Sequence, residues 1–187
     1  MNERELAEKL KAGQQAAFGL LYQTYARQLL VVITRYVVER EKSKDLLHDC
    51  FIKIFDKISQ FQYQGKGSLE AWLRRVCINE CLMYLRKEKR FETVSIDDRD
   101  DLQLQILEAE EPTEEEVERI PTEELGKMIQ ALPVGYRTVL TLFLVEGKSH
   151  KEIASMLGIN EKSSSSQLAR AKRQLAKAIK NWHKEIH

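Results

Sequence analysis

An acidic segment divides this chain into two parts and limits what it can fold into. Between Glu92 and Glu124, 14 acidic side chains accompany only two basic ones, which gives the segment a charge of −12. Since the whole chain of 187 residues has a formal charge of +1, the remainder has a charge of +13. The segment also contains Pro112 and Pro121 and few aliphatic side chains, so it cannot bury much apolar surface. We therefore expect an acidic linker between two basic domains, a pattern that suits polyanion binding at both ends.

The two flanking parts have the composition and periodicity of helices. The chain is rich in Leu, Lys, Glu, Ala, Arg and Gln and has only 8 Gly and 3 Pro. Apolar residues at helical spacing predict four helices before the acidic segment, the third capped by Ser43 and the fourth by Ser68. We predict an all-α fold, with a four-helix domain over residues 1–90, a linker over 91–121 that includes a short helix at 102–109, and a helical domain over 122–187.

The C-terminal domain contains the most informative local pattern of the chain. Ser149 and Glu152 form an S-x-x-E capping box that begins a short helix. Gly158 suits the left-handed residue that ends this helix, and Asn160 can cap the next one. Helix, glycine turn and helix is the helix-turn-helix arrangement, with an ordinary antiparallel helical hairpin as the alternative.

The second helix of this pair includes four consecutive serines at 163–166. Its periodicity places on the inner face Ser164, Leu168, Ala171, Leu175 and Ile179. We expect the Ser164 hydroxyl to bond to the backbone carbonyl of Asn160. Small hydroxyl side chains allow a close approach to DNA, while Arg and Lys contact phosphates or base edges. The residues expected in the major groove are Lys162, Ser163, Ser165, Ser166, Arg170 and Arg173.

Other classes of site have little support in the sequence. Cys50, Cys77 and Cys81 are an odd number without a CxxC pair, so we expect neither a disulfide framework nor a metal site. The four histidines fall in no catalytic motif, so we expect no enzyme and no cofactor. No apolar run approaches the roughly 18 residues that span a bilayer, and the N-terminus lacks a secretory signal. These features predict a cytoplasmic protein without membrane insertion.

Three segments in one order and spacing connect both domains to a known family. They are KDLLHDCFIKIF in the third helix, GSLEAWLRRVCINECLMYLRKEKR in the fourth, and KEIASMLGI followed by SQLARAKRQL at the C-terminus. Together they resemble the bacterial RNA polymerase sigma factors of the extracytoplasmic function group. The resemblance implies an alternative sigma factor, which binds core RNA polymerase, directs it to specific promoters and assists promoter opening.

The resemblance also implies the protein partners of the two domains. In the family, the N-terminal domain binds the clamp helices of the polymerase β′ subunit, and the C-terminal domain sits on the β flap. Carried over by motif, the polymerase-binding residues are Asp45, Leu46, Asp49, Phe51 and Lys53. Leu46 and Phe51 are equally compatible with a place in the core. The sequence leaves open whether an anti-sigma factor is a further partner.

Promoter DNA is expected to contact both domains, with the minus-ten element read by the first. The loop QFQYQGKGS resembles the family's loop that receives an unstacked promoter base, to which Phe61, Tyr63 and Lys66 would offer aromatic faces and charge. Trp72 is assigned to the core rather than to strand separation. On the fourth helix, the residues implied to contact the minus-ten element are Arg74, Arg75, Asn79, Arg86 and Lys87.

The chain departs from the family in the helix that would read the minus-thirty-five element. Lys162 and Ser163 stand where Gly-Thr is common, and Ser164 stands where valine is frequent. The acidic linker would pass near the polymerase active-site cleft, with a solvated spacer as the alternative. A second hypothesis for the whole chain is a helix-turn-helix transcriptional regulator that binds duplex DNA without polymerase.

Overall fold

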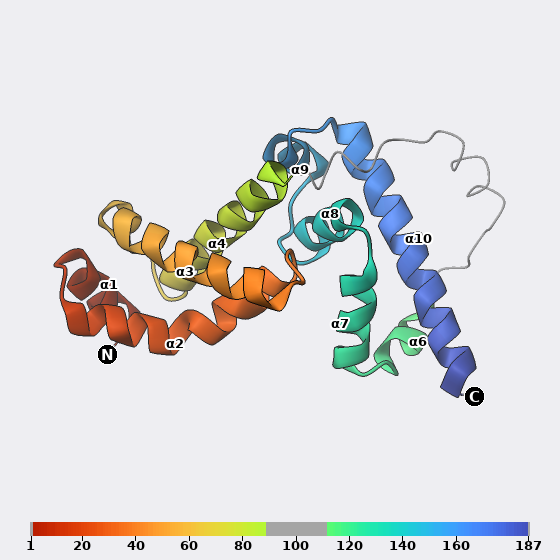
Figure 1. Cartoon of the computed structure of the whole chain (residues 1–187), viewed down its shortest axis with the longest axis horizontal. Helices are drawn as coiled ribbons and strands as arrows, with labels where there is room; N and C mark the ends of the chain where they lie inside the picture. The colour runs from red at the N-terminus through yellow and green to blue at the C-terminus, as the bar shows by residue number, and fades with distance from the viewer. Residues whose placement is uncertain (1, 89–111, 187) are drawn as a thin grey trace. The chain divides into compact units, whose positions relative to one another are not determined.

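The computed structural model describes residues 2–88 and 112–186, and its regular elements are all helical (Figure 1). This agrees with the predicted all-α fold. The chain divides into two compact units, Met1–Lys87 and Glu88–His187. The helix predicted at 102–109 and most of the predicted linker lie outside the described residues.

The first unit is built around three long helices. Its elements are α1 (Glu3–Lys11), α2 (Gln15–Thr34), α3 (Arg40–Lys57), the 3-10 turn η1 (Ile58–Gln60) and α4 (Ser68–Lys87). Helices α2, α3 and α4 pack against one another, while α1 packs against α2 and η1. Their facing sides bury an apolar core that includes Leu21, Ile33, Ile54, Leu73 and Leu82. Burial of this apolar surface stabilises the unit.

Helix α3 begins one turn earlier than the predicted cap at Ser43. The helix starts at Arg40, and Glu39 occupies the N-cap position without a side-chain cap hydrogen bond. Ser43 is buried, and its hydroxyl donates to the backbone carbonyl of Val37 at 2.7 Å. Val37 follows the end of α2, where the carbonyl groups leave the helical hydrogen-bond pattern. Ser43 therefore ties the turn between α2 and α3 together, and the prediction that it caps α3 is wrong.

Ser68 closes the loop before α4 instead of capping the helix. It is the first residue of α4, its hydroxyl donates to the carbonyl of Gly65 at 2.6 Å, and it accepts from the N–H of Gln64 at 3.2 Å. A capping side chain would accept a hydrogen bond from an N–H group further along the helix. The predicted capping role of Ser68 is therefore corrected.

The acceptor for the N-terminal N–H groups of α4 comes from α1. The carboxylate of Glu3 accepts hydrogen bonds from the N–H groups of Gly67 at 2.6 Å, Leu69 at 2.7 Å and Glu70 at 3.2 Å. A carboxylate is favoured here because its hydrogen bonds are charge-assisted and because the positive end of the helix dipole lies at the N-terminus. One side chain thus joins the first helix of the unit to the last.

The second unit is organised around its long C-terminal helix. Its elements are α6 (Glu114–Glu118), α7 (Thr122–Ala131), α8 (Val134–Leu144), α9 (His150–Leu157) and α10 (Glu161–Ile186). Helix α10 packs against each of the other four (Figure 1). The core includes Val139, Leu142, Ile153, Ala171 and Ile179. Arg137 is buried, and its Nη1 donates to the carbonyls of Gln130 and Leu132, both at 2.9 Å, which completes the end of α7.

The last part of the predicted linker has structure of its own within this unit. Thr113 and Glu116 form a capping box that begins α6. Ile120 is buried, and Nε2 of His183 on α10 lies 2.8 Å from the carbonyl oxygen of Glu116. Residues 113–120 therefore pack on α10, although their acidic composition predicts a linker that extends to residue 121.

Candidate nucleic-acid interface

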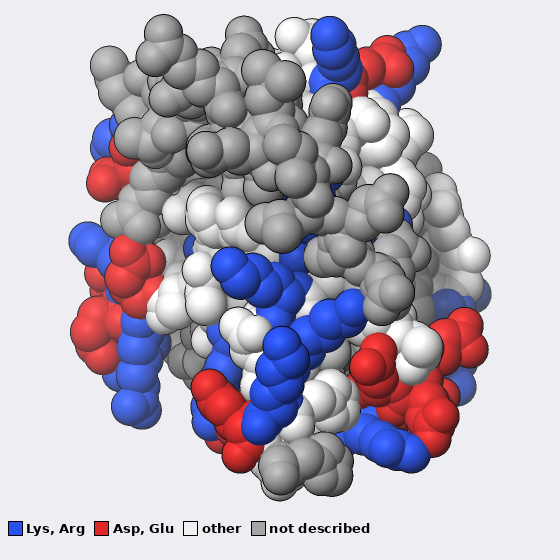
Figure 2. Space-filling view, turned by 90° about the vertical axis from the view of Figure 1, so that its right-hand side faces the viewer, with Lys and Arg blue, Asp and Glu red and all other residues white. Residues whose placement is uncertain are grey.

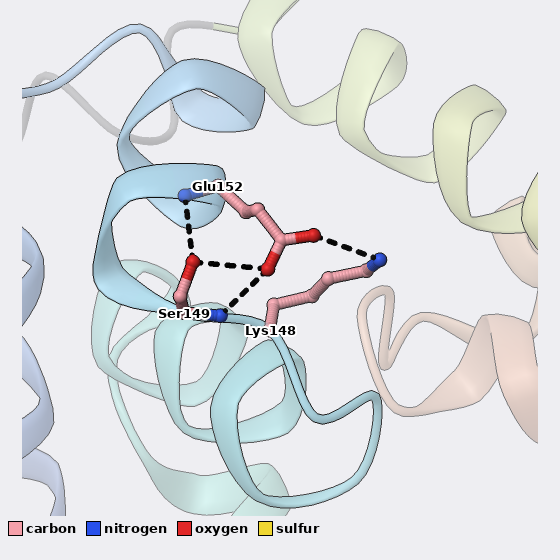
Figure 3. Close-up of polar contacts among 3 residues, drawn as sticks. All are labelled: Lys148, Ser149 and Glu152. Carbon is pink, nitrogen blue, oxygen red and sulfur yellow. Dashed lines mark hydrogen bonds and ion pairs between the residues drawn. The ribbon is translucent and has the colours of Figure 1, made fainter.

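The helix-turn-helix begins at a capping box on α9, as predicted (Figure 3). Ser149 Oγ accepts from the N–H of Glu152 at 3.3 Å, and Glu152 Oε2 accepts from the N–H of Ser149 at 2.9 Å. Lys148 Nζ lies 3.3 Å from Glu152 Oε1. The N–H and the hydroxyl of Ser149, together with Lys148, hold the pKa of Glu152 below its ordinary value, because all three favour the ionised carboxylate.

The turn between α9 and α10 also has the predicted geometry. Gly158 ends α9 in the left-handed conformation, with φ of 70°. Asn160 Oδ1 then accepts from the N–H of Ser163 at 2.7 Å, and α10 begins at Glu161. The four serines accordingly form the first turns of α10. The helix-turn-helix predicted from local sequence signals is confirmed.

The inner face of α10 is covered largely as its periodicity predicts. Ser164, Leu168, Ala171 and Ile179 are buried as predicted, and Leu175 is half-buried.

A polar contact that the sequence does not indicate joins the inner face of α10 to α9. Ser164 Oγ lies 2.9 Å from Nδ1 of His150, the first residue of α9. The His150 ring stacks on Phe143, with 4.9 Å between ring centroids. The expected bond from the Ser164 hydroxyl to the Asn160 carbonyl is therefore replaced by a bond between the two helices of the motif. Only the Ser164 N–H donates to that carbonyl, at 3.1 Å.

The exposed stripe of α10 includes two of the six residues predicted to contact DNA. Lys162, Ser165 and Ala169 are exposed, and Lys172 continues the same stripe. Ser163, Ser166 and Arg173 are half-buried. Arg170 is only 9 % exposed, which corrects its assignment to the groove-facing surface. Because α10 packs against four helices, the covered arc is wider than the one apolar stripe that the sequence pattern predicts.

The exposed charged side chains of α10 are four lysines and two glutamates, Glu161 and Glu185. The exposed cations of this helix are Lys162, Lys172, Lys177 and Lys184. Figure 2 shows Lys and Arg side chains gathered along the middle of the molecular face seen from the α10 side of Figure 1. A positively charged helix that follows a glycine turn suits a nucleic acid, because its lysines can neutralise phosphates.

Helix α4 presents a second polar stripe in the first unit. Arg75, Asn79, Arg86 and Lys87 are exposed, as predicted for DNA contacts, whereas Arg74 is half-buried. Met83 is 51 % exposed and lies on this stripe, four residues after Asn79. The stripe therefore combines cations that can hold phosphates with an amide and a thioether that can approach bases.

The loop before α4 presents one of its two predicted aromatic side chains. Tyr63 is 38 % exposed, and Lys66 is exposed. Phe61, however, is only 3 % exposed and packs against Trp72 with 5.5 Å between ring centroids. The prediction that the Phe61 ring is free to stack on a base is therefore wrong, because the ring is buried in the apolar core. Trp72 is half-buried in the same contact, so its ring lies only partly in the core predicted for it.

Helix α3 separates the predicted polymerase-binding residues into two groups. Asp45 and Asp49 are exposed and Lys53 is half-buried, whereas Leu46 and Phe51 are buried in the core. The alternative left open for Leu46 and Phe51 is thus decided in favour of the core.

Helix α3 also has exposed apolar side chains that the predicted polymerase-binding set does not include. Ile52 is 56 % exposed and Phe55 is 38 % exposed. Phe55 contacts Phe18 of α2 at 4.6 Å between ring centroids, and Tyr22 of α2, itself 42 % exposed, contacts Phe51 at 4.8 Å. The sequence does contain a signal for these exposed residues, because the apolar residues of α3 extend around more of the helix than one buried face can cover. Exposed apolar side chains next to carboxylates are typical of protein-binding surfaces.

The cysteines belong to the core of the first unit. Cys50, Cys77 and Cys81 are all fully buried. A hydrogen bond with Cys77 and burial raise the pKa of the Cys50 thiol, and burial raises that of Cys81. Within the described residues, no group of three or more His, Cys, Asp or Glu side chains converges as a metal site. None of the helices described here combines the length and the apolar character that a bilayer crossing requires.

Two family models match the chain in the segments that contain these surfaces. The model described as Sigma-70 region 2 matches residues 21–91, which include α3, α4 and the part of α2 from residue 21 onward. The model described as Sigma-70, region 4 matches residues 122–175, which include the helix-turn-helix. The two models match in order along one chain and leave α1 outside.

Full-length relatives show the same similarity. The chain is 28% identical over 186 residues to RNA polymerase sigma-H factor of Pseudomonas aeruginosa, with 95% of this chain and 93% of the relative covered. It is 27% identical over 188 residues to ECF RNA polymerase sigma-E factor of Haemophilus influenzae, with 96% of each covered.

A solved structure of CnrH in complex with the cytosolic domain of CnrY resembles the chain with a TM-score of 0.51, 21% identity, and 96% and 97% of the two chains covered. The sigma factor RpoE of Bartonella quintana, solved with the anti-sigma factor NepR, also gives a TM-score of 0.51 at 21% identity, with 87% and 96% covered. These two likenesses concern the fold.

Proposed function

Because the chain belongs to the extracytoplasmic function group of the sigma-70 family, we propose that each of its helical units contacts a different promoter element. The protein is an alternative sigma factor that binds core RNA polymerase and directs it to promoters. The observation that supports this role most directly is that α4 and α10, which lie in the two matched regions of one chain, each expose a stripe of polar side chains that includes cations. The domains we propose are residues 1–90 for the polymerase and the minus-ten element, 91–121 as the acidic linker, and 122–187 for the minus-thirty-five element. The last part of this linker, which includes α6, packs on α10 of the second domain.

The second domain would read the minus-thirty-five element with the exposed stripe of α10. Lys162, Ser165 and Lys172 are the side chains on this stripe that can reach phosphates or base edges. Ser163, Ser166 and Arg173 border it and remain in the proposed contact set. Because Ala169 and Ser165 have short side chains, the backbone of α10 can approach the base pairs closely in the major groove.

The first domain would engage the minus-ten element after the strands separate. Tyr63 can stack on an unpaired base, while Lys66 and the cations of α4 hold phosphates. Asn79 can form hydrogen bonds with a base edge. The free energy of capturing unpaired bases offsets the cost of unpairing, so that binding itself assists promoter opening. This role needs no catalytic centre in the chain.

Polymerase would bind the first domain on the exposed side of α3. Asp45, Asp49 and Lys53 provide charges for this contact, and Ile52 and Phe55 provide apolar area. The partner surfaces that we propose are the clamp helices of the β′ subunit for the first domain and the β flap for the second. An anti-sigma factor that covers these surfaces would keep the protein inactive. We expect this work to take place in the cytoplasm, with the acidic linker near the polymerase active-site cleft.

The test is transcription by purified core RNA polymerase with and without the protein, on genomic fragments of the bacterium that encodes it. We expect a complex with the core enzyme on a sizing column and discrete run-off transcripts that require the protein. Non-specific transcription together with no complex would contradict the proposal. Specific binding to duplex DNA in the absence of polymerase, without any effect on transcription start sites, would favour the helix-turn-helix regulator instead.

A further inference from the structure

Helix α1 lies outside both matched family segments, yet it holds the loop that precedes α4. The matched segment of the first unit begins at residue 21, whereas α1 ends at Lys11. The contacts from α1 to the loop and to the start of α4 join residues that lie more than 60 positions apart in the chain. The sequence of the loop alone therefore does not determine how the loop is held.

The main contact is the carboxylate of Glu3. Its Oε2 accepts from the N–H of Gly67 at 2.6 Å, and its Oε1 accepts from the N–H of Leu69 at 2.7 Å and of Glu70 at 3.2 Å. Both carboxylate oxygens are thus used, one on the last loop residue and one on the first turn of α4. Because the acceptor is ionised, these are charge-assisted bonds, stronger than bonds between neutral groups.

A second contact from α1 reaches the other end of the same loop. Lys11 Nζ lies 6.0 Å from the centroid of the Phe61 ring, a cation–π distance. An open pocket of about 320 Å³ separates α1 from the loop. Its lining consists of Arg4, Ala7, Glu8 and Lys11 from α1 and Phe61 and Tyr63 from the loop. Helix α1 therefore borders the loop along its length, with Tyr63 at the edge of the pocket.

The loop has a backbone that needs such support. Gly65 and Gly67 have φ of 125° and 87°, conformations that other residues rarely adopt. Glycine loses more conformational entropy on ordering than any other residue. Inside this loop, the Ser68 hydroxyl bridges Gln64 and Gly65, and Glu3 supplies the bond that fixes Gly67.

We propose that Glu3 is a positioning residue for promoter opening: by fixing the loop 61–67 on the N-terminus of α4, it places Tyr63 and Lys66 for contact with an unpaired DNA strand. This inference rests on the proposed function, since it assigns to α1 a part in the same minus-ten contact. Glu3 itself need not touch DNA for this role. Because Glu3 orders the loop before binding, the loop loses less conformational entropy when it binds a base.

The experiment compares holoenzymes made with the wild-type chain, Glu3→Ala, Glu3→Gln and the matched control Glu5→Gln. Glu5 lies in the same first turn of α1, but its carboxylate binds Lys9 at 2.8 Å within the helix. The probe is a fluorescent single-stranded oligonucleotide of the non-template minus-ten segment, taken from a promoter that the wild-type holoenzyme transcribes. Two further measurements are competition for core polymerase and binding of a duplex that contains only the minus-thirty-five element.

We expect Glu3→Ala to weaken single-strand binding about tenfold, the size of effect that follows from the loss of charge-assisted hydrogen bonds. Glu3→Gln should fall between Glu3→Ala and the wild type, because an amide keeps one acceptor oxygen and replaces the other by a donor. Core competition and duplex binding should change less than twofold in both variants, and Glu5→Gln should match the wild type throughout. A role limited to stability would lower all three activities together.

The inference is overturned if Glu3→Ala and Glu3→Gln bind the single strand as tightly as the wild type, or if core competition and duplex binding fall in parallel with it. If Glu3→Ala does not fold, the decision rests on Glu3→Gln, which retains one acceptor. A wild-type holoenzyme that fails to bind the single strand at all would instead contradict the proposed function, so the two failures are distinguishable.

Discussion

The two units of this chain position their functional side chains in different ways. In the second unit, the helix-turn-helix is set by bonds between residues three or four apart, such as Ser149 with Glu152 and Asn160 with Ser163. In the first unit, the loop before α4 is held by Glu3, a residue 64 positions from Gly67. Hydrogen bonds between near neighbours produce a motif that can be recognised in the sequence. A hydrogen bond between distant residues produces no recognisable pattern around either partner.

The two units also differ in what they bury. Among the described residues, the first unit buries the polar groups of Ser43 and of the Tyr36 hydroxyl, while the second buries Arg137, Thr138, Thr141, Ser164 and Arg170. The first unit therefore depends chiefly on apolar packing, whereas the second also depends on hydrogen bonds of buried polar side chains such as Arg137 and Ser164. Substitutions in the two units can test which of these interactions each unit needs.

Removing apolar packing from the first unit should have the largest effect. Leu73 is fully buried in α4, so Leu73→Ala leaves a cavity and should lower the free energy of unfolding by about 2–5 kcal/mol. The matched control is Leu144→Ala, at a position that is 58 % exposed, and it should change stability by less than about 0.5 kcal/mol. Urea unfolding followed by circular dichroism measures both. Equal effects of the two substitutions would show that packing in α4 does not determine stability.

The outer face of α10 provides the second test. Lys172→Ala should weaken minus-thirty-five duplex binding and lower the slope of log affinity against log salt by about one, because one phosphate contact is lost. Arg170→Ala should instead reduce the stability of the second unit and leave the salt slope unchanged, since Arg170 is buried. Fluorescence anisotropy at several salt concentrations separates the two. The reverse assignment of effects would return Arg170 to the DNA surface.

The bond between the two helices of the motif is the third test. Ser164→Ala removes the partner of His150 Nδ1 and should lower the free energy of unfolding by about 1 kcal/mol. Ser165→Ala, one position away on the exposed surface, is the control, and it should be neutral or slightly stabilising because alanine favours helix. Thermal unfolding of the two variants makes the comparison. No difference between them would mean that the contact between His150 and Ser164 contributes little.

The capping box of α9 should show the smallest effect, and one that depends on pH. The pKa of Glu152 is lowered in the folded state, so its contribution to stability is present above the ordinary pKa of 4.5 and is lost as the pH falls through the lower folded value. The advantage of the wild type over Glu152→Gln should therefore shrink on acidification. Thermal midpoints of both proteins across this pH range give the measurement. An advantage that is constant with pH would contradict the role of the ionised carboxylate.

The sequence predicted the second unit better than the first for a physical reason. The capping box, the left-handed Gly158 and the Asn160 cap are all local, and each appears in the structure as expected. The inner face of α10 was also predictable, because 3.6-residue periodicity places Ser164 and Leu168 together.

The predictions that were wrong have a common cause. Each depends on which groups contact a side chain after the helices have packed. Arg170 is covered because α10 packs against four helices. Phe61 is covered because Trp72 lies beside it. Ser43 and Ser68 have the chemistry of N-caps, but in the structure they bond to the carbonyls of Val37 and Gly65.

The sequence by itself determined the helical class of this protein, the two-part arrangement of its charge, its helix-turn-helix and its family. These properties depend on composition, on periodicity and on bonds between near neighbours. Only the tertiary structure decided which arc of α10 is exposed, that His150 joins Ser164, and that Glu3 caps α4. Each of these depends on which distant backbone or side-chain groups are brought within hydrogen-bonding or packing distance, and that is settled only when the helices assemble around a common core.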